Sequence, residues 1–393
     1  MRAIKILALI CIAYLILLEV ARVYFIMPFP GSQQKETIDF AYFLHNTILY
    51  FRIMGWAVLV LSGLLSLSSL SKPWKLVLAI GVVLYGVVFY LFNFRFLADK
   101  MFYQPENIVF HDLIKNKVEQ SKLILGVTLN GEAKAYPIEI IGYHHQVRDS
   151  IGGLPVMVTY CTVCRTGRVF SPMVNGVPEN FRLVGMDHFN AMFEDQTTKS
   201  WWRQATGEAI TGTLTGRVLD EIPSEQMSLR AWLNLFPDSK ILQPDSLFVE
   251  KYKKLEGFDL GTIDSHLLYK DSLSWMEKSW VVGVTVRDHS RAYDWNDLMK
   301  NKIINDTLGG TSLLLYLQPD SVSFNVWKRD TLEFSINNGK LQDRQTNSLW
   351  NTSGICVEGI LTGNQLQKTQ AYQEFWHSWR TFHPATTRYL LTK

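Results

Sequence analysis

Two cysteines three positions apart are the side chains of this chain with the clearest chemical potential. Cys161 and Cys164 end an apolar stretch in the sequence VMVTYCTVCRTGRVF. Such a pair supplies two soft ligands for a transition metal, a thiol-disulfide redox couple, or a small structural disulfide. The sequence leaves these three alternatives open.

The metal hypothesis needs further ligands, and histidine and methionine residues occur on both sides of the pair. The candidates are His144, His145, Met186, His188 and Met192. A mixture of thiolate, imidazole and thioether suits copper, especially Cu(I), better than magnesium or calcium. Because His144 and His145 are adjacent, they point in different directions, and we expect at most one of them to reach a shared ion. The sequence predicts a soft-metal site with copper as the expected cofactor.

The redox hypothesis rests on Arg165 and Arg168, whose charges would favour a thiolate. Against it, the RTGRVFS that follows the cysteines is typical of a turn and a strand, so no helix N-terminus would help to lower the thiol pKa. A structural disulfide would be permitted in an oxidising compartment. Covalent c-type haem is excluded because Arg165, not His, follows Cys164.

The part of the chain after the apolar N-terminal region contains an internal sequence duplication. LGVTLNGEAKAY…VRDSIGG (125–153) aligns without a gap with VGVTVRDHSRAY…INDTLGG (282–310), a constant shift of 157 residues, and WLNLFP at 232–237 matches WRTFHP at 379–384. Shared features predict the fold, and features of the first copy alone locate the chemistry. In the second copy Cys161, Cys164, His144 and His145 are replaced by Gln318, Ser321, Asn301 and Lys302.

A polar string in the first copy resembles an active site but recurs in the second. Its residues are Asp195, Thr198, Ser200 and Trp202, and the second copy has Asp343, Thr346, Ser348 and Trp350. We therefore interpret the string as a turn held by side-chain hydrogen bonds. Gln204 is the exception, since it faces Thr352, and we expect it to contact a ligand or cofactor.

Three apolar runs at 4–27, 48–70 and 76–97 each exceed the roughly 20 residues that a helix needs to cross a bilayer. We predict three transmembrane helices with an uncleaved first span. Glu19 and Arg22 in that span either reach the interface or form a polar seam against another helix.

The positive charges predict the orientation of the chain in the membrane. Arg2 and Lys5 precede the first span, and Lys72 and Lys75 precede the third. Cytoplasmic loops carry more Lys and Arg, so everything after the third span is expected on the extracytoplasmic side of the cytoplasmic membrane of a prokaryote. The expected partner is the lipid bilayer. A net charge of +3 without a basic stripe excludes a nucleic-acid partner.

Short strands punctuated by turns dominate the duplicated part, as at the Asn130-Gly131 hairpin signal. In the first copy helix is expected only around 138–144 and in SLRAWLNLF (228–236), and the second copy is expected to end in a helical AYQEFWHSWRTF (371–382). Because few helices separate these strands, the predicted class is α+β, strand-rich and mostly antiparallel, with two similar lobes whose seam would form a cleft. The expected regions are membrane 1–100, connector 101–121, first lobe 122–243, linker 244–278 and second lobe 279–393.

The motif order AYP…H…D.IGG.PV.VTYC…G…VF, followed by M..D..T.SWW.Q..GEAI.G…L, resembles the bacterial and archaeal family catalogued as domain of unknown function 3179, over residues 105 to 390. The resemblance implies domain limits and an extracytoplasmic or membrane-attached location, without an activity. The family commonly has Glu where this chain has His145, and the membrane front is an addition to the family domain.

The function expected from the sequence is a membrane-anchored extracytoplasmic protein that binds a soft metal ion through its first lobe. The alternatives are a thiol-disulfide oxidoreductase and a non-catalytic binding module with a structural disulfide and a ligand in the cleft between the lobes. No Ser-His-Asp spacing, phosphate loop or dinucleotide fingerprint accompanies the cysteines.

Overall fold

The computed structural model describes residues 2–66 and 71–391, which form two compact units. Unit 1 comprises Met1–Tyr103, Glu179–Arg203 and Glu208–Val218, and unit 2 comprises Gln104–Pro178, Gln204–Gly207 and Leu219–Lys393. The residues expected to form the first lobe therefore contribute to both units.

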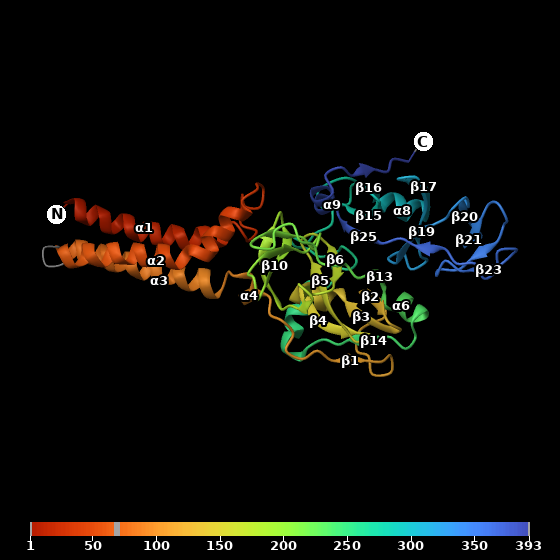
Figure 1. The fold of residues 1–393 in the computed structure, drawn as a ribbon, viewed down its shortest axis with the longest axis horizontal. Helices are drawn as coiled ribbons and strands as arrows, with labels where there is room; N and C mark the ends of the chain where they lie inside the picture. The colour runs from red at the N-terminus through yellow and green to blue at the C-terminus, as the bar shows by residue number, and fades with distance from the viewer. Residues whose placement is uncertain (1, 67–70, 392–393) are drawn as a thin grey trace. The chain divides into compact units, whose positions relative to one another are not determined.

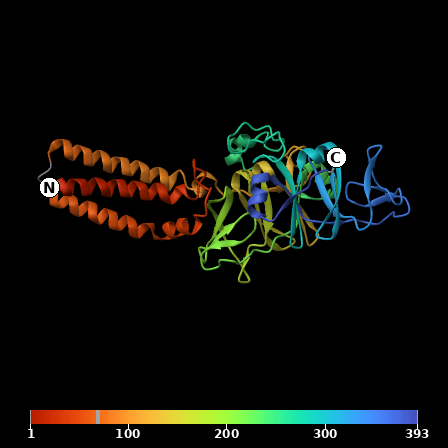
Figure 2. The same cartoon turned by 90° about the horizontal axis from the view of Figure 1, so that it is seen from above.

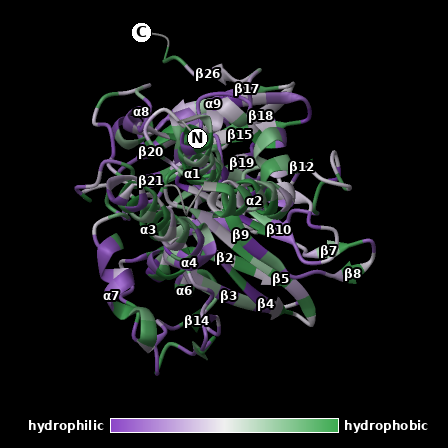
Figure 3. Cartoon of the chain, turned by 90° about the vertical axis from the view of Figure 1, so that its left-hand side faces the viewer, coloured by the Kyte–Doolittle hydropathy of each residue, from purple (hydrophilic) through white to green (hydrophobic). Residues whose placement is uncertain are grey.

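Three long helices of unit 1 run side by side (Figures 1 and 2). They are α1 (Arg2–Tyr24), α2 (Ile38–Ser66) and α3 (Lys72–Phe94). All three are long and apolar enough to cross a membrane, and Figure 3 shows them end-on with their apolar residues in green. The three segments expected to span a membrane are thus helices of sufficient length and hydropathy, although α2 begins at Ile38 rather than at residue 48, and residues 67–70 of the second expected span lie outside the described residues.

A polar seam links these helices. The buried Glu19 carboxylate accepts hydrogen bonds from Arg52 at 2.6 and 2.7 Å and from Asn93 at 2.9 Å, and Arg22 donates to Asn93 at 2.7 Å. A charge inside a bilayer is costly unless it is paired. Glu19 is therefore part of a seam, and its partner is Arg52 of α2 rather than Arg22.

Unit 1 also contains a four-stranded antiparallel sheet in the order β12-β11-β10-β9, next to the short α4 (Ala98–Met101). Its strands are β9 (Phe181–Asp187), β10 (Asn190–Asp195), β11 (Trp201–Arg203) and β12 (Ala209–Thr211). The Met186 amide donates to the Ile26 carbonyl at 2.7 Å, and a Cβ on Gly185 would collide with that carbonyl. The absence of a side chain at Gly185 thus lets the sheet contact the segment after α1.

Unit 2 contains two similar sets of sheets. The first copy has the order β1-β14-β3-β2-β13, made of β1 (Phe110–His111), β2 (Leu123–Leu129), β3 (Glu132–Pro137), β13 (Ser224–Ser228) and β14 (Lys240–Leu242). The second has β25-β15-β16-β26, made of β15 (Trp280–Val286), β16 (His289–Asp294), β25 (Ala371–Phe375) and β26 (Thr387–Arg388). β13 and β25 are edge strands of these sheets.

A second sheet follows in each copy. The first copy has β4 (Gln146–Ile151), β5 (Leu154–Cys161) and β6 (Thr166–Phe170), and the second has β17 (Ile303–Leu308), β18 (Thr311–Leu317), β19 (Phe324–Lys328) and β24 (Gln367–Lys368). Helices α5 (Ile138–His144) and α6 (Leu229–Leu235) of the first copy correspond to α8 (Trp295–Asn301) and α9 (Trp376–Phe382).

The remaining elements of unit 2 are short. They are the hairpin β7 (Met173–Val174) and β8 (Val177–Pro178), the linker turns η2 (Ser246–Phe248), α7 (Val249–Tyr252) and η3 (Lys253–Leu255), and a sheet of β20 (Phe334–Asn337), β21 (Lys340–Asp343), β22 (Leu349–Trp350) and β23 (Cys356–Glu358).

Matching contacts confirm the internal duplication and the α+β, mostly antiparallel class. Trp232 of α6 packs on Gly126, and Trp379 of α9 packs on Gly283, where any Cβ would collide with the indole. One expectation is wrong: AYQEFWHSWRTF is helical only from Trp376, because Ala371–Phe375 pairs with β15 as strand β25.

Candidate functional site

The two cysteines lie on a tight hairpin between β5 and β6. Cys161 pairs with Thr166 across the hairpin, and Arg165 has a positive φ of 55° in the loop. Both cysteines are fully buried, and their thiols are hydrogen-bonded to each other rather than joined by a disulfide. Cys164 is followed directly by a turn and strand β6, which confirms the expectation that no helix begins there.

The surroundings keep Cys164 protonated. Burial raises the pKa of the Cys164 thiol well above its usual value, and a hydrogen bond with the Cys161 thiol raises it further. Lys278, rather than Arg165 or Arg168, is the cation that lowers this pKa. The Lys278 ammonium is held by the carbonyls of Val163 at 2.6 Å and Leu267 at 2.7 Å. The thiolate support expected from the two arginines is therefore not found.

The two histidines upstream of the cysteines have protein partners of their own. His144 Nε2 lies 2.7 Å from the Tyr252 hydroxyl, and His145 Nδ1 lies 2.9 Å from the Tyr160 carbonyl. His145 ends α5 with φ of 61°, as Lys302 ends α8 with φ of 66°. Burial lowers the pKa of His145 to about 4, so this ring is neutral at pH 7. The position is a helix C-cap in both copies.

His188 and Met192 belong to unit 1. His188 lies in the β9–β10 turn, where its Nδ1 is 2.7 Å from the Asp187 carboxylate, and Met192 is fully buried in β10. Within residues 2–66 and 71–391, no group of three or more His, Cys, Asp or Glu side chains could hold a metal ion. Of the six expected ligands, the structure brings together the hydrogen-bonded thiols of Cys161 and Cys164.

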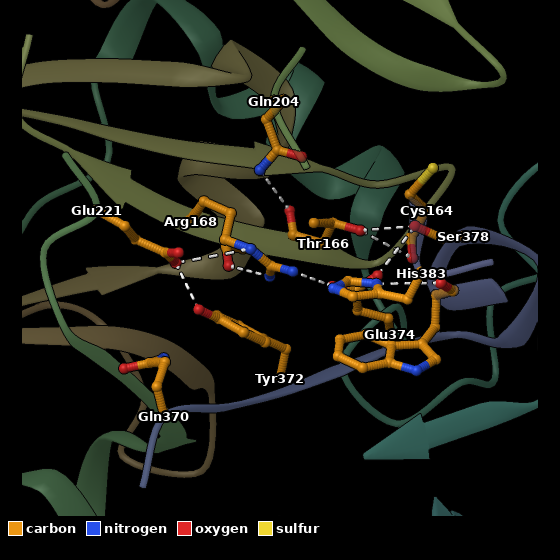
Figure 4. Close-up of polar contacts among 12 residues, drawn as sticks. Cys164, Thr166, Arg168, Gln204, Glu221, Gln370, Tyr372, Glu374, Ser378 and His383 are labelled. Atoms are coloured by element: carbon orange, nitrogen blue, oxygen red, sulfur yellow. Dashed lines mark hydrogen bonds and ion pairs between the residues drawn. The ribbon is translucent and has the colours of Figure 1, made fainter. Parts of the chain in front are cut away.

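Gln204 forms hydrogen bonds with both strands of the hairpin that carries the cysteines. Its side-chain amide nitrogen donates to the Thr159 hydroxyl and to the Thr166 carbonyl, both at 3.0 Å, and only 1% of the residue is exposed. Figure 4 shows it above β6, close to Thr166. The amide thus joins β5 to β6, and its expected ligand contact stays a prediction.

A buried ionic network lies beside the hairpin (Figure 4). The Arg168 guanidinium, 2% exposed, donates to Glu374 at 2.5 Å and lies 3.3 Å from the centre of the Tyr372 ring. Glu221 is 3.6 Å from Arg168 and accepts from the Tyr372 hydroxyl at 2.7 Å, while Ser378 donates to Glu374 at 3.0 Å. Desolvation raises the pKa of Glu221, and Arg168 opposes this shift. Sequence reasoning missed Glu221, Tyr372 and Glu374.

The two copies meet through equivalent residues. The match between Trp232 and Trp379, a shift of 147 residues, places Gln226 on Gln373, and the Gln226 amide donates to Gln373 Oε1 at 2.8 Å. The shift of 157 residues places Phe170 on Trp327 and the shift of 147 places Glu221 on Lys368, so the bridge between Phe170 and Glu221 corresponds to the pairing of Trp327 with Lys368. A residue and its equivalent in the other copy are called counterparts below.

A cleft of about 280 Å³ lies at this seam, lined by β2 and β13 of the first copy and by β19, β24 and β25 of the second. The expected cleft between the lobes is therefore present. Asn325, the counterpart of Arg168, lines it, and Lys368 donates to Glu225 there at 2.5 Å. Glu225 and Thr369 also line it, and the buried Glu225 Oε2 and Thr369 Oγ1 have no hydrogen-bond partner among residues 2–66 and 71–391. This arrangement can bind a polar molecule.

The comparisons with known proteins give a family without an activity. No curated protein and no solved structure matches this chain. A family model described as "Protein of unknown function (DUF3179)" matches residues 106–386, which is more than half of the sequence. The chain, with three candidate membrane helices before the matched region, therefore belongs to the DUF3179 family.

Proposed function

We propose that this protein is a membrane-anchored ligand-binding protein and that its ligand occupies the cleft between the two copies. This proposal rests on two residues of the lining, because Glu225 Oε2 and Thr369 Oγ1 lack a hydrogen-bond partner in the described part of the chain. A buried polar atom without a partner costs about 1–3 kcal/mol, which a hydrogen-bonding ligand would offset. The volume of about 280 Å³ is near the lower limit of ordinary small-molecule sites.

The thiols support the alternative functions less well. Cys161 and Cys164 are fully buried, and the raised pKa of Cys164 disfavours the nucleophilic thiolate that a redox enzyme needs. The two thiols are hydrogen-bonded to each other rather than joined as a disulfide, so the binding module that we propose does not depend on a structural disulfide between them.

Soft-metal binding remains a second candidate because the two buried thiols are hydrogen-bonded to each other. Copper would be held by the thiols of Cys161 and Cys164, which are soft donors that lie side by side. Elemental analysis of the full chain purified without oxygen tests this proposal. Copper in the wild type that disappears in Cys161→Ser/Cys164→Ser supports it, and equal copper in both proteins contradicts it.

We also propose that the duplicated region faces the extracytoplasmic side. Arg2 and Lys5 near the start of α1, and Lys72 and Lys75 at the start of α3, favour a cytoplasmic location for those two ends. A C-terminal alkaline phosphatase fusion, which is active only outside the cytoplasm, would show activity. An inactive but well-expressed fusion would reverse the orientation.

Cleft binding is tested with a variant that places an arginine in the cleft, at the position that corresponds to Arg168 of the first copy. Asn325→Arg places the residue type of its counterpart, Arg168, in the cleft, and Thr331→Arg adds the same charge at an exposed turn. Titration calorimetry of the full chain would use D-glucose, glycerol, agmatine and inorganic phosphate. A probe that binds the wild type and Thr331→Arg but not Asn325→Arg supports the proposal. Unchanged binding in Asn325→Arg, or no binding by any probe, contradicts it.

A further inference from the structure

The lining of the cleft specifies the chemical class of its ligand. We infer that the ligand is a small uncharged molecule rich in hydroxyl groups, of the size of a polyol or a single sugar ring. This inference rests on the proposed binding function and adds to it the substrate class.

The charges of the lining balance each other. Glu225 and Lys368 are its charged side chains, and they form an ion pair of 2.5 Å. A cationic ligand that approaches Glu225 meets the ammonium of Lys368, and an anionic ligand that approaches Lys368 meets the second oxygen of Glu225. Like charges at contact distance repel, most strongly where water is excluded. The lining therefore disfavours ions of either sign.

The corresponding part of the seam, around Arg168, shows how this fold surrounds a buried cation. The Arg168 guanidinium is surrounded there by Glu374, Glu221 and the ring of Tyr372. The counterparts of these three residues are Met227, Lys368 and Glu225. One carboxylate replaces two, and a cation is added, so the cleft lacks the excess of negative charge that holds the guanidinium in the other half.

The hydrogen-bonding groups of the cleft require both a donor and an acceptor from the ligand. Glu225 Oε2 can only accept, whereas the Thr369 hydroxyl can donate or accept. Asn325 Oδ1 already accepts from Gln318 at 2.8 Å, which leaves its amide nitrogen to donate. A hydroxyl group donates and accepts at once, so neighbouring hydroxyls on one molecule can satisfy this mixed lining.

The size and the apolar part of the lining agree with this class. A volume of about 280 Å³ equals the space of about nine waters at roughly 30 Å³ each, which suits one ring rather than an oligomer. Phe324, Val326 and Pro223 also line the cleft and offer apolar surface to the C–H groups of such a molecule.

The test compares probe classes on the full chain, purified in a detergent without a sugar head group. The neutral probes are D-glucose, myo-inositol and glycerol, the cation is agmatine, and the anion is inorganic phosphate. We expect calorimetric binding of at least one neutral probe, lost in Asn325→Arg and about tenfold weaker in Thr369→Val, which removes one hydrogen bond at nearly constant volume. Thr331→Val, at an exposed turn, is the matched control and should bind like the wild type.

The outcomes separate the inference from the function on which it rests. Agmatine or phosphate binding that Asn325→Arg abolishes, without binding of any neutral probe, overturns the ligand class and leaves the cleft as a binding site. Neutral-probe binding that survives Asn325→Arg overturns both. If no probe of any class binds the wild type, the proposed function fails together with the inference.

Discussion

The seam between the two copies has one filled half and one open half. In the filled half, Arg168 places its guanidinium against Glu374, Glu221 and Tyr372. In the open half the counterpart is Asn325, whose shorter side chain lines a cleft of about 280 Å³. The backbone frame is the same, so a few substitutions after duplication suffice to make one side a structural contact and the other a binding site.

The largest effect is expected from emptying the filled half. Arg168→Asn leaves Glu374, which is 1% exposed, without its ionic partner. Removing one member of a buried ion pair destabilises a protein by about 3–5 kcal/mol. We expect a loss of this size in the free energy of unfolding, measured by urea titration of tryptophan fluorescence. The matched variant Asn325→Ala should cost less, about 1–3 kcal/mol, because the buried Gln318 amide loses a neutral acceptor and no ion loses its partner.

A double variant then converts the filled half of the seam into a copy of the open half. Arg168→Asn/Glu374→Met gives the filled half the two residue types that the open half has at these positions, because the counterparts of Arg168 and Glu374 are Asn325 and Met227. Removing both charges should recover most of the lost stability, because a buried pair replaced as a whole is often close to neutral. A double variant as unstable as Arg168→Asn would show that the seam requires the ion pair itself and that uncharged side chains cannot replace it.

An intermediate effect is expected from the helix ends before the cysteine hairpin, where the first copy has His145 and the second has Lys302. The folded pKa of His145 is lowered to about 4 by burial, below its unfolded value of about 6.5. Above pH 6.5 the ring is neutral in both states and costs nothing. As the pH falls from 6.5 towards 4, the unfolded chain takes up a proton that the folded protein excludes, so stability is lost in that window. The loss should be on the order of 2 kcal/mol at pH 5.

His145→Asn tests this contribution, because Asn tolerates the left-handed backbone and does not titrate. The variant should lose less stability than the wild type between pH 7 and pH 5 in urea unfolding. His377, whose pKa burial lowers to about 3, adds a dependence of the same sign that remains in the variant. An identical pH dependence in both proteins would mean that His145 is not buried as a neutral ring.

Local sequence signals were enough for much of the fold. The Asn130-Gly131 turn, the helix at 138–144 and the strand before Cys161 follow from residue type and periodicity, and all are found. AYQEF was misread because its apolar spacing also suits a helix, whereas pairing with β15 across some 90 residues of chain makes it strand β25. Tertiary pairing overrode local preference there.

The candidate site was harder to predict because its residues come from distant segments. Arg168 and Glu374 are 206 residues apart, and no local pattern marks them as partners. The comparison of copies pointed to the first copy, where the cysteines are, although Asn325, Lys368 and Thr369 of the second copy line the cleft. Differences between copies locate divergence, and either copy can be the one that gained a ligand.

The smallest effect is expected at Cys164, whose counterpart is Ser321. Cys164→Ser should cost about 1 kcal/mol or less, because Ser378, which hydrogen-bonds the Cys164 thiol, can bond the new hydroxyl. Burial of both thiols and the raised pKa of Cys164 predict that Cys161 and Cys164 in the native chain fail to react with a thiol reagent at pH 8, whereas urea exposes them. Fast labelling of Cys164 in the folded protein would contradict this and return the first copy to consideration as a redox site. Slow labelling, limited by the rate of unfolding, would indicate that the cysteine hairpin has a packing role and would favour the open half of the seam as the functional site.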